Sequence, residues 1–426
     1  MKTIPHRYRV LALLCSLTTL TYLDRICISL VGVRVKTAFH LSNEEFGWVL
    51  ASFSLAYALF EIPTGILGDK IGPRAVFIRI VLWWSFFTAL TGFAGGLISL
   101  MIIRFLFGIG EAGTYPNAMI VMSRWFPIRE MGRALVWVGM GSQIGSAIAP
   151  LIIIPIAAAY GWQMPFFVNA AIGLIWVFVC ASWFRNFPRE MKGISTAEVA
   201  LIEQNCRHEQ HTRSLNWKFI LNNRNLWKLM LMYFCCQWAN YFFVAWMPVY
   251  LQEGRNFSEN QMKGITSVLF IAGIISTFVG GIAADFAVRK AGLKIGRRVI
   301  GITGLGGCGL MIFLAALVPD KILSAIFLVA GNAFFSFGVM VSYAVCTDIG
   351  RNNSGTVTGA MNFCGQMGAF SLALLFGKMA DALHNFNYPL FLVAFVMITG
   401  GLLWLGIDPE SKLKMPDTTE LAASPA

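Results

Sequence analysis

The hydrophobic and polar positions of the chain fall into long blocks. Apolar runs of about 20 residues, the length that lets a helix cross a bilayer, recur almost from end to end. They are apolar on nearly every side, whereas the strands of a membrane β-barrel would alternate polar and apolar residues over about ten positions. The pattern predicts twelve transmembrane helices, at residues 10–33, 45–67, 75–95, 97–122, 133–158, 163–184, 227–251, 260–284, 298–318, 321–347, 354–379 and 387–407.

One long polar segment, residues 185–225, interrupts this pattern and separates six predicted helices from six. A break of this kind predicts two halves joined by a linker. The expected division is an N-terminal half at 1–184, a cytoplasmic linker at 185–226, a C-terminal half at 227–408 and a cytoplasmic tail at 409–426.

The linker carries two local signals. Ser195 and Glu198 have the spacing of a capping box, which predicts that a short surface helix begins there. His208 and His211 have a spacing that metal ligands can use, but no third ligand is evident, so a solvated loop is the better interpretation. We expect no metal and no cofactor.

Composition agrees with a membrane protein. The chain is 57% hydrophobic and 13% charged, whereas soluble proteins have about a quarter charged residues. The net charge of +12 is explained by topology rather than by nucleic-acid binding, because 25 of the 33 Lys and Arg residues lie on the side of the N-terminus and six on the opposite side. Since cytoplasmic loops concentrate Lys and Arg, we expect a multi-pass protein of the cell inner (plasma) membrane with both termini cytoplasmic.

The two halves repeat a short motif. The second predicted helix ends in "GILGDKIGPR" (65–74) and the eighth in "GIAADFAVRK" (281–290), so that Gly65 corresponds to Gly281 and Asp69 to Asp285. Internal repeats of this kind are typical of secondary transporters, with a substrate site near the midplane between the repeats.

Charges inside the predicted helices are the main chemical signal. "IIRFLFGIGEAG" (102–113) contains Arg104 and Glu111, and a charge at the bilayer centre costs about 2.5–3.5 kcal/mol on insertion scales. Seven helical residues place the two within about 20° of each other and roughly 10 Å apart along the axis, too far to presume a salt bridge. Asp24 and Arg25 supply a second pair in the first helix. Such charges face a bundle interior or a cavity. They can serve transport, and the alternative is a purely structural charge network without a transport role.

Two sets of motifs carry a family resemblance. The turn at 65–74 resembles the signature loop of the major facilitator superfamily, which implies a conformational gate. Further stretches resemble the anion:cation symporter family, whose members include transporters of hexuronates, aldonates and glucarate. These stretches are "TYLDR" (21–25), "RFLFGIGEAGTYPNAMIVMSRWFP" (104–127), "NRNLWKLMLMYF" (223–234), "MPVYL" (247–251) and "GTVTGAMNFCGQMGA" (355–369). The expected gate residues are Gly65, Asp69, Lys70, Gly72, Arg74 and Asp285.

The resemblance implies an all-α polytopic membrane fold with twelve transmembrane helices in two pseudo-symmetric six-helix halves. It also implies that Arg25 and Arg104 bind an anionic substrate while Asp24 and Glu111 carry protons. Arginine offers bidentate binding to a carboxylate, and burial disfavours the charged form of an acid, so that a proton can be taken up and released. The remaining substrate-binding residues are expected to be Tyr22, Tyr57, Gln143, Asn362, Ser342 and Tyr343, with helix–helix hydrogen bonding as the alternative role.

Two features depart from the family pattern. Glu61 stands where many relatives have an uncharged polar residue, and its position suggests a partner for the gate rather than a third proton carrier. Gln237, Asn240 and Tyr241 form a polar face in the seventh helix, where many relatives have a different polar pattern. This second difference leaves the identity of the substrate open.

The expected function is therefore proton-coupled symport of a small organic anion, with a sugar acid (hexuronate, aldonate or aldarate) as first choice, by alternating access. The alternatives are a facilitator or antiporter of another carboxylate, such as an aromatic acid, and a transporter-like anion sensor. An enzyme is not expected, because no cluster of acids, His or Ser marks a membrane–water interface. The expected partners are the anion, protons and the lipid bilayer, with the protein a monomer that binds no nucleic acid.

Overall fold

The computed structural model describes residues 4–205, 223–350 and 354–411, and these segments contain helices but no strand. Ten of the helices are long and apolar enough to cross a membrane. This confirms the all-α polytopic fold. The N-terminal half contains α1 (His6–Leu30), α2 (Gly32–Phe39), α3 (Asn43–Ile71), α4 (Pro73–Thr91), α5 (Leu97–Glu111), α6 (Thr114–Trp125), α7 (Ile128–Tyr160) and α8 (Met164–Trp183). The C-terminal half contains α11 (Arg224–Tyr241), η2 (Phe242–Trp246), α12 (Met247–Val249), η3 (Tyr250–Gly254), α13 (Glu259–Leu317), α14 (Lys321–Gly350), α15 (Ser354–Ala382), α16 (Asn387–Leu403) and η5 (Trp404–Gly406).

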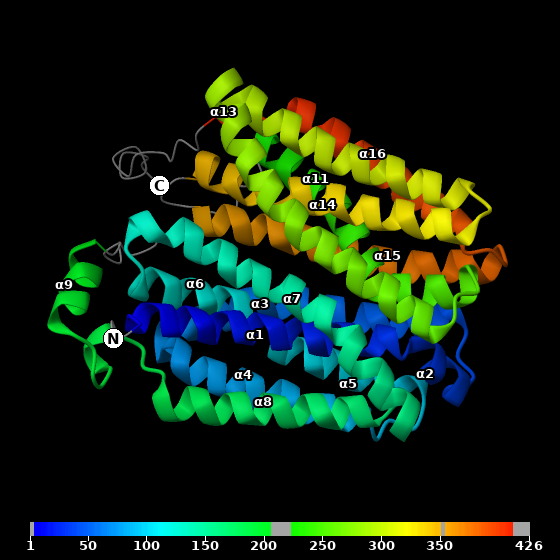
Figure 1. Ribbon diagram of the computed structural model, residues 1–426, viewed down its shortest axis with the longest axis horizontal. Helices are drawn as coiled ribbons and strands as arrows, with labels where there is room; N and C mark the ends of the chain where they lie inside the picture. The colour runs from blue at the N-terminus through cyan, green and yellow to red at the C-terminus, as the bar shows by residue number, and fades with distance from the viewer. Residues whose placement is uncertain (1–3, 206–222, 351–353, 412–426) are drawn as a thin grey trace, which may run out of the picture.

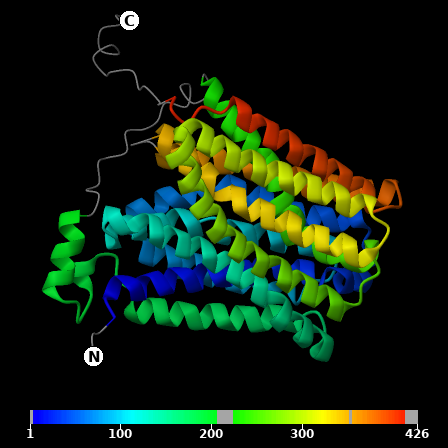
Figure 2. The same ribbon diagram turned by 45° about the horizontal axis from the view of Figure 1, so that its top comes forward.

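The two halves lie side by side with their long helices running in roughly the same direction (Figure 1). Between them in sequence come η1 (Pro188–Glu190) and α9 (Thr196–Asn205). Both views show α9 beyond one end of the bundle, and α2 lies at the other end (Figures 1 and 2). We call these the α9 end and the α2 end.

Two predicted spans take an unexpected form. The chain from 259 to 317 is assigned as one helix, but Gly292 has φ +82°, and a Cβ on Gly296 would lie 2.6 Å from the backbone nitrogen of Val288, so the chain folds back there. The predicted span at 227–251 is α11 followed by π-helical turns, where Pro248 has no N–H to donate. With both arms of α13 and this interrupted helix included, each of the twelve predicted spans has a helical counterpart.

The halves approach closely near the α2 end because glycines face backbone across the interface. A Cβ on Gly47 of α3 would lie 2.6 Å from the carbonyl oxygen of Ala373 in α15, and a Cβ on Gly377 would lie 2.2 Å from that of Asn43. Small residues allow helix backbones to come together in membranes. Any side chain at these positions would push α3 and α15 apart.

Polar contacts join the halves at the same end. Asp381, at the end of α15, accepts hydrogen bonds from the side-chain amide of Asn43 and from the backbone N–H of Glu44, both at 2.7 Å. It thereby satisfies a backbone donor at the start of α3. Two ion pairs lie nearby: Arg34 to Glu259 at 2.7 Å and Lys36 to Glu253 at 2.6 Å. These contacts fasten the halves together at the α2 end.

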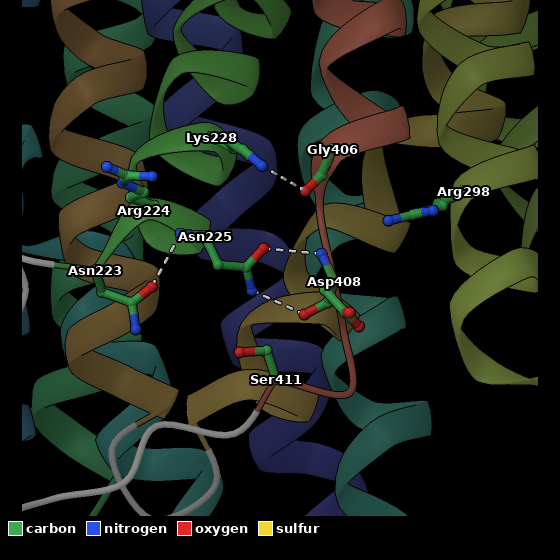
Figure 3. A pocket seen from close by; sticks show the side chains of 8 residues that line it. All are labelled: Asn223, Arg224, Asn225, Lys228, Arg298, Gly406, Asp408 and Ser411. Carbon is green, nitrogen blue, oxygen red and sulfur yellow. Dashed lines mark hydrogen bonds between the residues drawn. The ribbon is translucent and has the colours of Figure 1, made fainter.

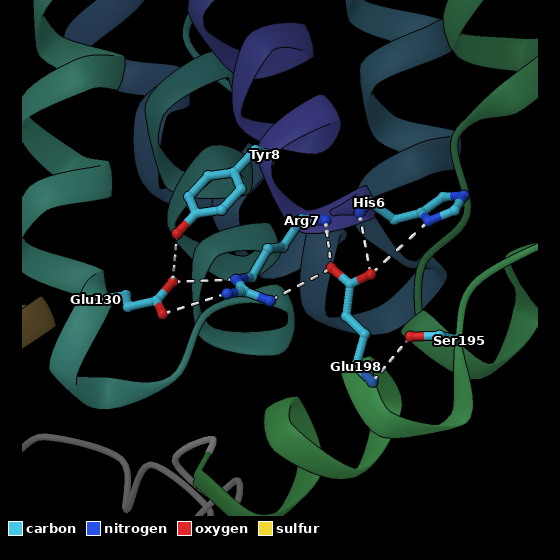
Figure 4. Close-up of polar contacts among 6 residues, drawn as sticks. All are labelled: His6, Arg7, Tyr8, Glu130, Ser195 and Glu198. Carbon is cyan, nitrogen blue, oxygen red and sulfur yellow. Dashed lines mark hydrogen bonds and ion pairs between the residues drawn. The ribbon is translucent and has the colours of Figure 1, made fainter. Parts of the chain in front are cut away.

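The helix α9 begins directly after Ser195, whose hydroxyl accepts the backbone N–H of Glu198 at 3.2 Å. The Glu198 carboxylate does not complete a capping box, however. It accepts the backbone N–H groups of His6 and Arg7 at 3.1 Å each, at the start of α1 (Figure 4). Arg7 in turn binds Glu130 of α7 at 3.0 Å. The linker is thus tied to two helices of the N-terminal half. His208 and His211 lie outside the described residues.

Candidate functional site

The four intramembrane charges come together in the N-terminal half. Asp24 and Arg25 lie in α1, and Arg104 and Glu111 lie in α5. Asp24 and Arg104 are 3% exposed and Glu111 is fully buried. At this depth an unpaired charge would be strongly disfavoured, so the arrangement of partners determines what the cluster can do.

Arg25 and Glu111 form a direct ion pair. Nε and Nη2 of Arg25 donate to the same oxygen, Oε1 of Glu111, at 2.9 and 2.6 Å. The partner of Glu111 is therefore on α1, while Arg104 lies on the same helix as Glu111, about two turns earlier on the same stripe. The pair neutralises two of the four charges and joins α1 to α5.

The aromatic ring of Phe53, in α3, lies against both arginines. Its centroid is 4.9 Å from the Arg25 guanidinium and 5.2 Å from that of Arg104. Tyr22 and Tyr57 also lie beside Arg25, at 4.8 and 5.0 Å. Ring faces stabilise cations where water is scarce. Sequence reasoning identified both tyrosines but missed Phe53, because one more Phe in an apolar run carries no signal.

Three polar atoms of the cluster have no hydrogen-bond partner within the described part of the chain. They are Oδ1 of Asp24, Nε of Arg104 and Oε2 of Glu111, and all three are buried. Buried polar groups are normally satisfied. The cluster therefore has unused capacity to bind a proton on the acids and an anion on Arg104.

Gly108, between Arg104 and Glu111 on α5, sets the spacing of the site. A Cβ at this position would lie 2.7 Å from the carbonyl oxygen of Phe53 and 2.9 Å from the Cβ of Ala56. Because glycine has no Cβ, α5 can pack directly on α3 and bring Phe53 to the arginines.

Glu61 corrects one expectation. We predicted that it would pair with the gate, but its carboxylate accepts a hydrogen bond from the side-chain amide of Asn362 in α15 at 3.4 Å. Glu61 follows Tyr57 by one helical turn and shares its inward face, whereas eight residues turn Asp69 by about 80° to another face. Glu61 is buried and Asp69 is exposed. A carboxylate and an amide thus meet between the halves.

The two other predicted residues of the C-terminal half, Ser342 and Tyr343, both contact side chains of α11. The hydroxyls of Tyr343 and Tyr233 are 2.7 Å apart. Ser342 is fully buried, and its hydroxyl faces the sulfur of Met232 at 4.0 Å. The structure therefore pairs Tyr343 with a tyrosine that sequence reasoning missed, and places Ser342 against α11.

One further amide, that of Gln143, and one hydroxyl, that of Tyr241, lie where the two halves meet. Oε1 of Gln143 is buried without a partner in the described chain and lies 3.4 Å from the position of a Cβ on Gly273 in α13. The hydroxyl of Tyr241, in α11, donates to the carbonyl of Leu50 in α3 at 2.7 Å. Gln143 of α7 therefore lies against α13 of the other half.

The predicted gate residues lie at the α9 end. Gly72 has φ +86° and ends α3, and the side chain of Asn186 fills the space beside it, accepting the backbone N–H of Arg74 at 2.9 Å. Gly65 faces Pro116 of α6. The exposed members of the set are Asp69, Lys70 and Asp285. Within the described residues no group of three His, Cys, Asp or Glu is arranged to hold a metal ion.

Comparisons with known proteins agree with this architecture. Residues 14–373 match the Major Facilitator Superfamily. The chain is 28% identical to a probable sulfoacetate transporter of Cupriavidus necator over 97% of this chain and 96% of that protein. It is 29% identical to the hexuronate transporter of Bacillus subtilis over 86% of each, and 27% identical to a D-galactonate transporter of Escherichia coli over 94% and 95%.

Solved structures share the fold. A D-xylose–proton symporter superposes with a TM-score of 0.77 at 15% identity, covering 95% of this chain and 98% of that one. An inward-facing bacterial homologue of the human lysosomal transporter Spinster superposes with a TM-score of 0.75 at 17% identity, covering 95% and 97%. The multi-pass membrane character expected from the sequence is confirmed.

Proposed function

Because the chain belongs to the Major Facilitator Superfamily, whose members are transporters and not enzymes, we propose that it is a proton-coupled symporter of a small organic anion. A sugar acid is the proposed substrate class. The hexuronate and D-galactonate transporters among its relatives support this choice. Because another relative is a probable sulfoacetate transporter, sulfoacetate is the competing substrate that the test must include.

The observation that carries the proposal is the ion pair between Arg25 and Glu111. In the structure this pair occupies the Arg25 guanidinium through two donors. A proton on Glu111 removes the charge that holds Arg25, so the guanidinium becomes available for bidentate binding of a carboxylate. Substrate and proton then favour each other, which is the thermodynamic requirement for symport.

Arg104 and Asp24 complete the proposed machinery. Arg104 has a buried, unbonded Nε and provides the second cationic contact to the anion. Asp24, whose Oδ1 is also buried and unbonded, is the second proton-carrying group. Protons that enter with the anion offset its charge, and hence a membrane potential that opposes it by about 2.3 kcal/mol per charge per 100 mV.

The remaining polar residues would recognise the rest of the substrate. Hydroxyls and amides suit a polyhydroxylated acid because each can donate and accept hydrogen bonds. The proposed set is Tyr22, Tyr57, Gln143, Asn362, Ser342 and Tyr343. The contact of Asn362 with Glu61 supports a substrate-linked role for Asn362, since it joins the two halves beside the cluster.

Alternating access would proceed by rocking of the two halves, 1–184 and 227–408, about this site. The fastening at the α2 end corresponds to a state closed on that side. The distribution of Lys and Arg supports cytoplasmic termini in the inner membrane, so the α9 end would face the cytoplasm. The gate set of Gly65, Asp69, Lys70, Gly72, Arg74 and Asp285 would then hold the opposite, outward-facing state. We propose that a monomer carries out this cycle.

The test is uptake into proteoliposomes under an imposed pH gradient. The panel is glucuronate, galacturonate, gluconate, galactonate, glucarate and sulfoacetate, with gradient-free vesicles as the control. We expect gradient-driven accumulation of at least one sugar acid. If only sulfoacetate accumulates, the sugar-acid assignment is wrong while proton coupling stands. If anions equilibrate or exchange but never accumulate, the protein is a facilitator or antiporter. Binding without any flux would identify a sensor.

A further inference from the structure

A surface pocket of about 500 Å³ lies at the α9 end of the C-terminal half, and none of its lining residues belongs to the buried charge cluster (Figure 3). Three separate stretches of chain form it: the start of α11, the second arm of α13, and the segment that follows η5. Its lining residues are Asn223, Arg224, Asn225, Lys228, Arg298, Gly406, Asp408 and Ser411.

Hydrogen bonds within the chain fix the walls of this pocket. The Asn225 amide donates to the carbonyl of Asp408 and accepts its backbone N–H, both at 2.8 Å. Lys228 donates to the carbonyl of Gly406 at 3.1 Å, and Nε of Arg298 donates to that of Ile407 at 2.8 Å. The start of α11 is therefore held against the end of α16, and the shape of the pocket is set before anything binds.

The lining carries an excess of positive charge. Arg224, Lys228 and Arg298 are basic, and Asp408 is the acidic residue among the lining side chains. Asp408 already binds Lys294 at 2.7 Å, and this hydrogen bond holds the pKa of the Asp408 carboxyl below its usual range. Lys228 and Arg298 each donate one side-chain hydrogen bond within the chain and keep further donors. Arg224 is exposed, and its side chain makes no hydrogen bond or ion pair to another described residue. The pocket therefore favours an anion.

Exposed apolar side chains follow or precede pocket residues on both α11 and the end of α16. Trp227 and Leu231 are exposed on α11, and Leu402 and Leu405 are exposed on α16 and η5. Trp227 adjoins Lys228 in sequence and Leu405 adjoins Gly406, and Lys228 donates a hydrogen bond to the carbonyl of Gly406. Each of these two walls of the pocket therefore carries an exposed apolar side chain next to a residue of this hydrogen bond. Tryptophan is enriched where hydrocarbon meets the headgroup region. A basic pocket beside an exposed apolar surface matches both parts of a phospholipid.

We propose that this pocket binds the phosphodiester headgroup of an anionic phospholipid from the leaflet at the α9 end, with the acyl chains against Trp227 and Leu405. Basic pockets between transmembrane helices bind such headgroups through charge and hydrogen bonds. Lys228 and Arg298 act as the inner contacts and Arg224 as the outer one. The site is independent of the transport function proposed above.

The experiment uses the purified full-length protein in detergent, titrated with dioctanoyl phosphatidylglycerol, dioctanoyl phosphatidylcholine or inorganic phosphate, with thermal melting and native mass spectrometry as readouts. The variants are Arg224→Gln, which removes a side chain that makes no hydrogen bond or ion pair in the described chain, and the double variant Lys228→Gln with Arg298→Gln. Arg289→Gln is the matched control, because Arg289 is an exposed base on α13 outside the pocket.

We expect phosphatidylglycerol to raise the melting temperature and remain bound in the mass spectrometer at concentrations where phosphatidylcholine does neither. Affinity should fall about threefold in Arg224→Gln and at least tenfold in the double variant, and Arg289→Gln should match the wild type. Equal effects of both lipids would overturn the proposal, as would an equal loss in Arg289→Gln. The same shift with inorganic phosphate at equal concentration would identify a free-anion site and also overturn it. If the double variant does not fold, an unchanged affinity in Arg224→Gln decides against the site.

Discussion

Arg25 and Glu111 are 86 residues apart in sequence, yet they form a hydrogen-bonded ion pair with a shortest distance of 2.6 Å inside the membrane region. The same guanidinium lies over the rings of Tyr22, Phe53 and Tyr57. The proposed coupling follows from this geometry, because one arginine has two competing anionic partners, the Glu111 carboxylate and the substrate.

Glu111→Gln should abolish accumulation driven by a pH gradient while leaving substrate exchange measurable. The amide keeps the size of the side chain but cannot be ionised, so Arg25 stays available to the anion and binding no longer depends on a proton. Counterflow of labelled substrate measures exchange, and gradient-driven uptake measures coupling. Glu203→Gln, at a half-buried acid of α9 outside the membrane helices, is the control. Retained accumulation in Glu111→Gln would assign coupling to another group.

Arg104→Ala should weaken substrate binding by roughly 10- to 100-fold, as expected for loss of hydrogen bonds between charged groups worth about 1.5–3 kcal/mol. Arg104→Lys should recover part of the affinity, because the ammonium keeps the charge but not the bidentate geometry. Equilibrium binding to purified protein checks both. Wild-type affinity in Arg104→Ala would remove this residue from the binding site.

The α2-end fastening should control which side of the protein is open. Lys36→Glu replaces the attraction to Glu253 by repulsion and should favour opening at the α2 end by about tenfold, for a contact worth about 1.5 kcal/mol. Spin labels on Thr37→Cys in α2 and Asn260→Cys in α13, both exposed positions, should report a longer distance.

The reciprocal double variant, Lys36→Glu with Glu253→Lys, is the matched control for this fastening. Because the two charges are exchanged, the attraction returns and the original distance distribution should be restored. If the double variant stays as open as the single variant, the ion pair does not hold the halves together. The hydrogen bond between Asn43 and Asp381 would then be the next contact to test.

Glu198→Ala should release α9 from the start of α1. The variant loses the acceptor of two backbone N–H groups, those of His6 and Arg7, at a cost of about 1 kcal/mol, the scale of a lost helix cap. We expect faster proteolysis within the linker and a lower melting temperature. Glu203→Ala, which removes an exposed ion pair with Arg189, should change little. Equal proteolysis of the two variants would show that Glu198 does not anchor the linker.

The sequence by itself determined the class of fold. Apolar runs of bilayer length, the single long polar break and the paired motifs at 65–74 and 281–290 are local or repeated signals, and each can be identified without knowing a contact. Helical periodicity also placed Arg104 and Glu111 correctly on one stripe, because the geometry of a single helix depends only on the spacing of its residues. The surface helix beginning after Ser195 was predicted for the same reason.

Only the tertiary structure decided which residues are partners. Glu111 pairs with Arg25 on another helix, Glu61 meets Asn362 of the other half rather than the gate, and Glu198 binds the start of α1 instead of its own helix cap. Phe53 became part of the site because Gly108 lets α5 pack on α3. Partnership between helices depends on their rotation and distance in the bundle, which many small packing contacts set together, and no local pattern of residues encodes it.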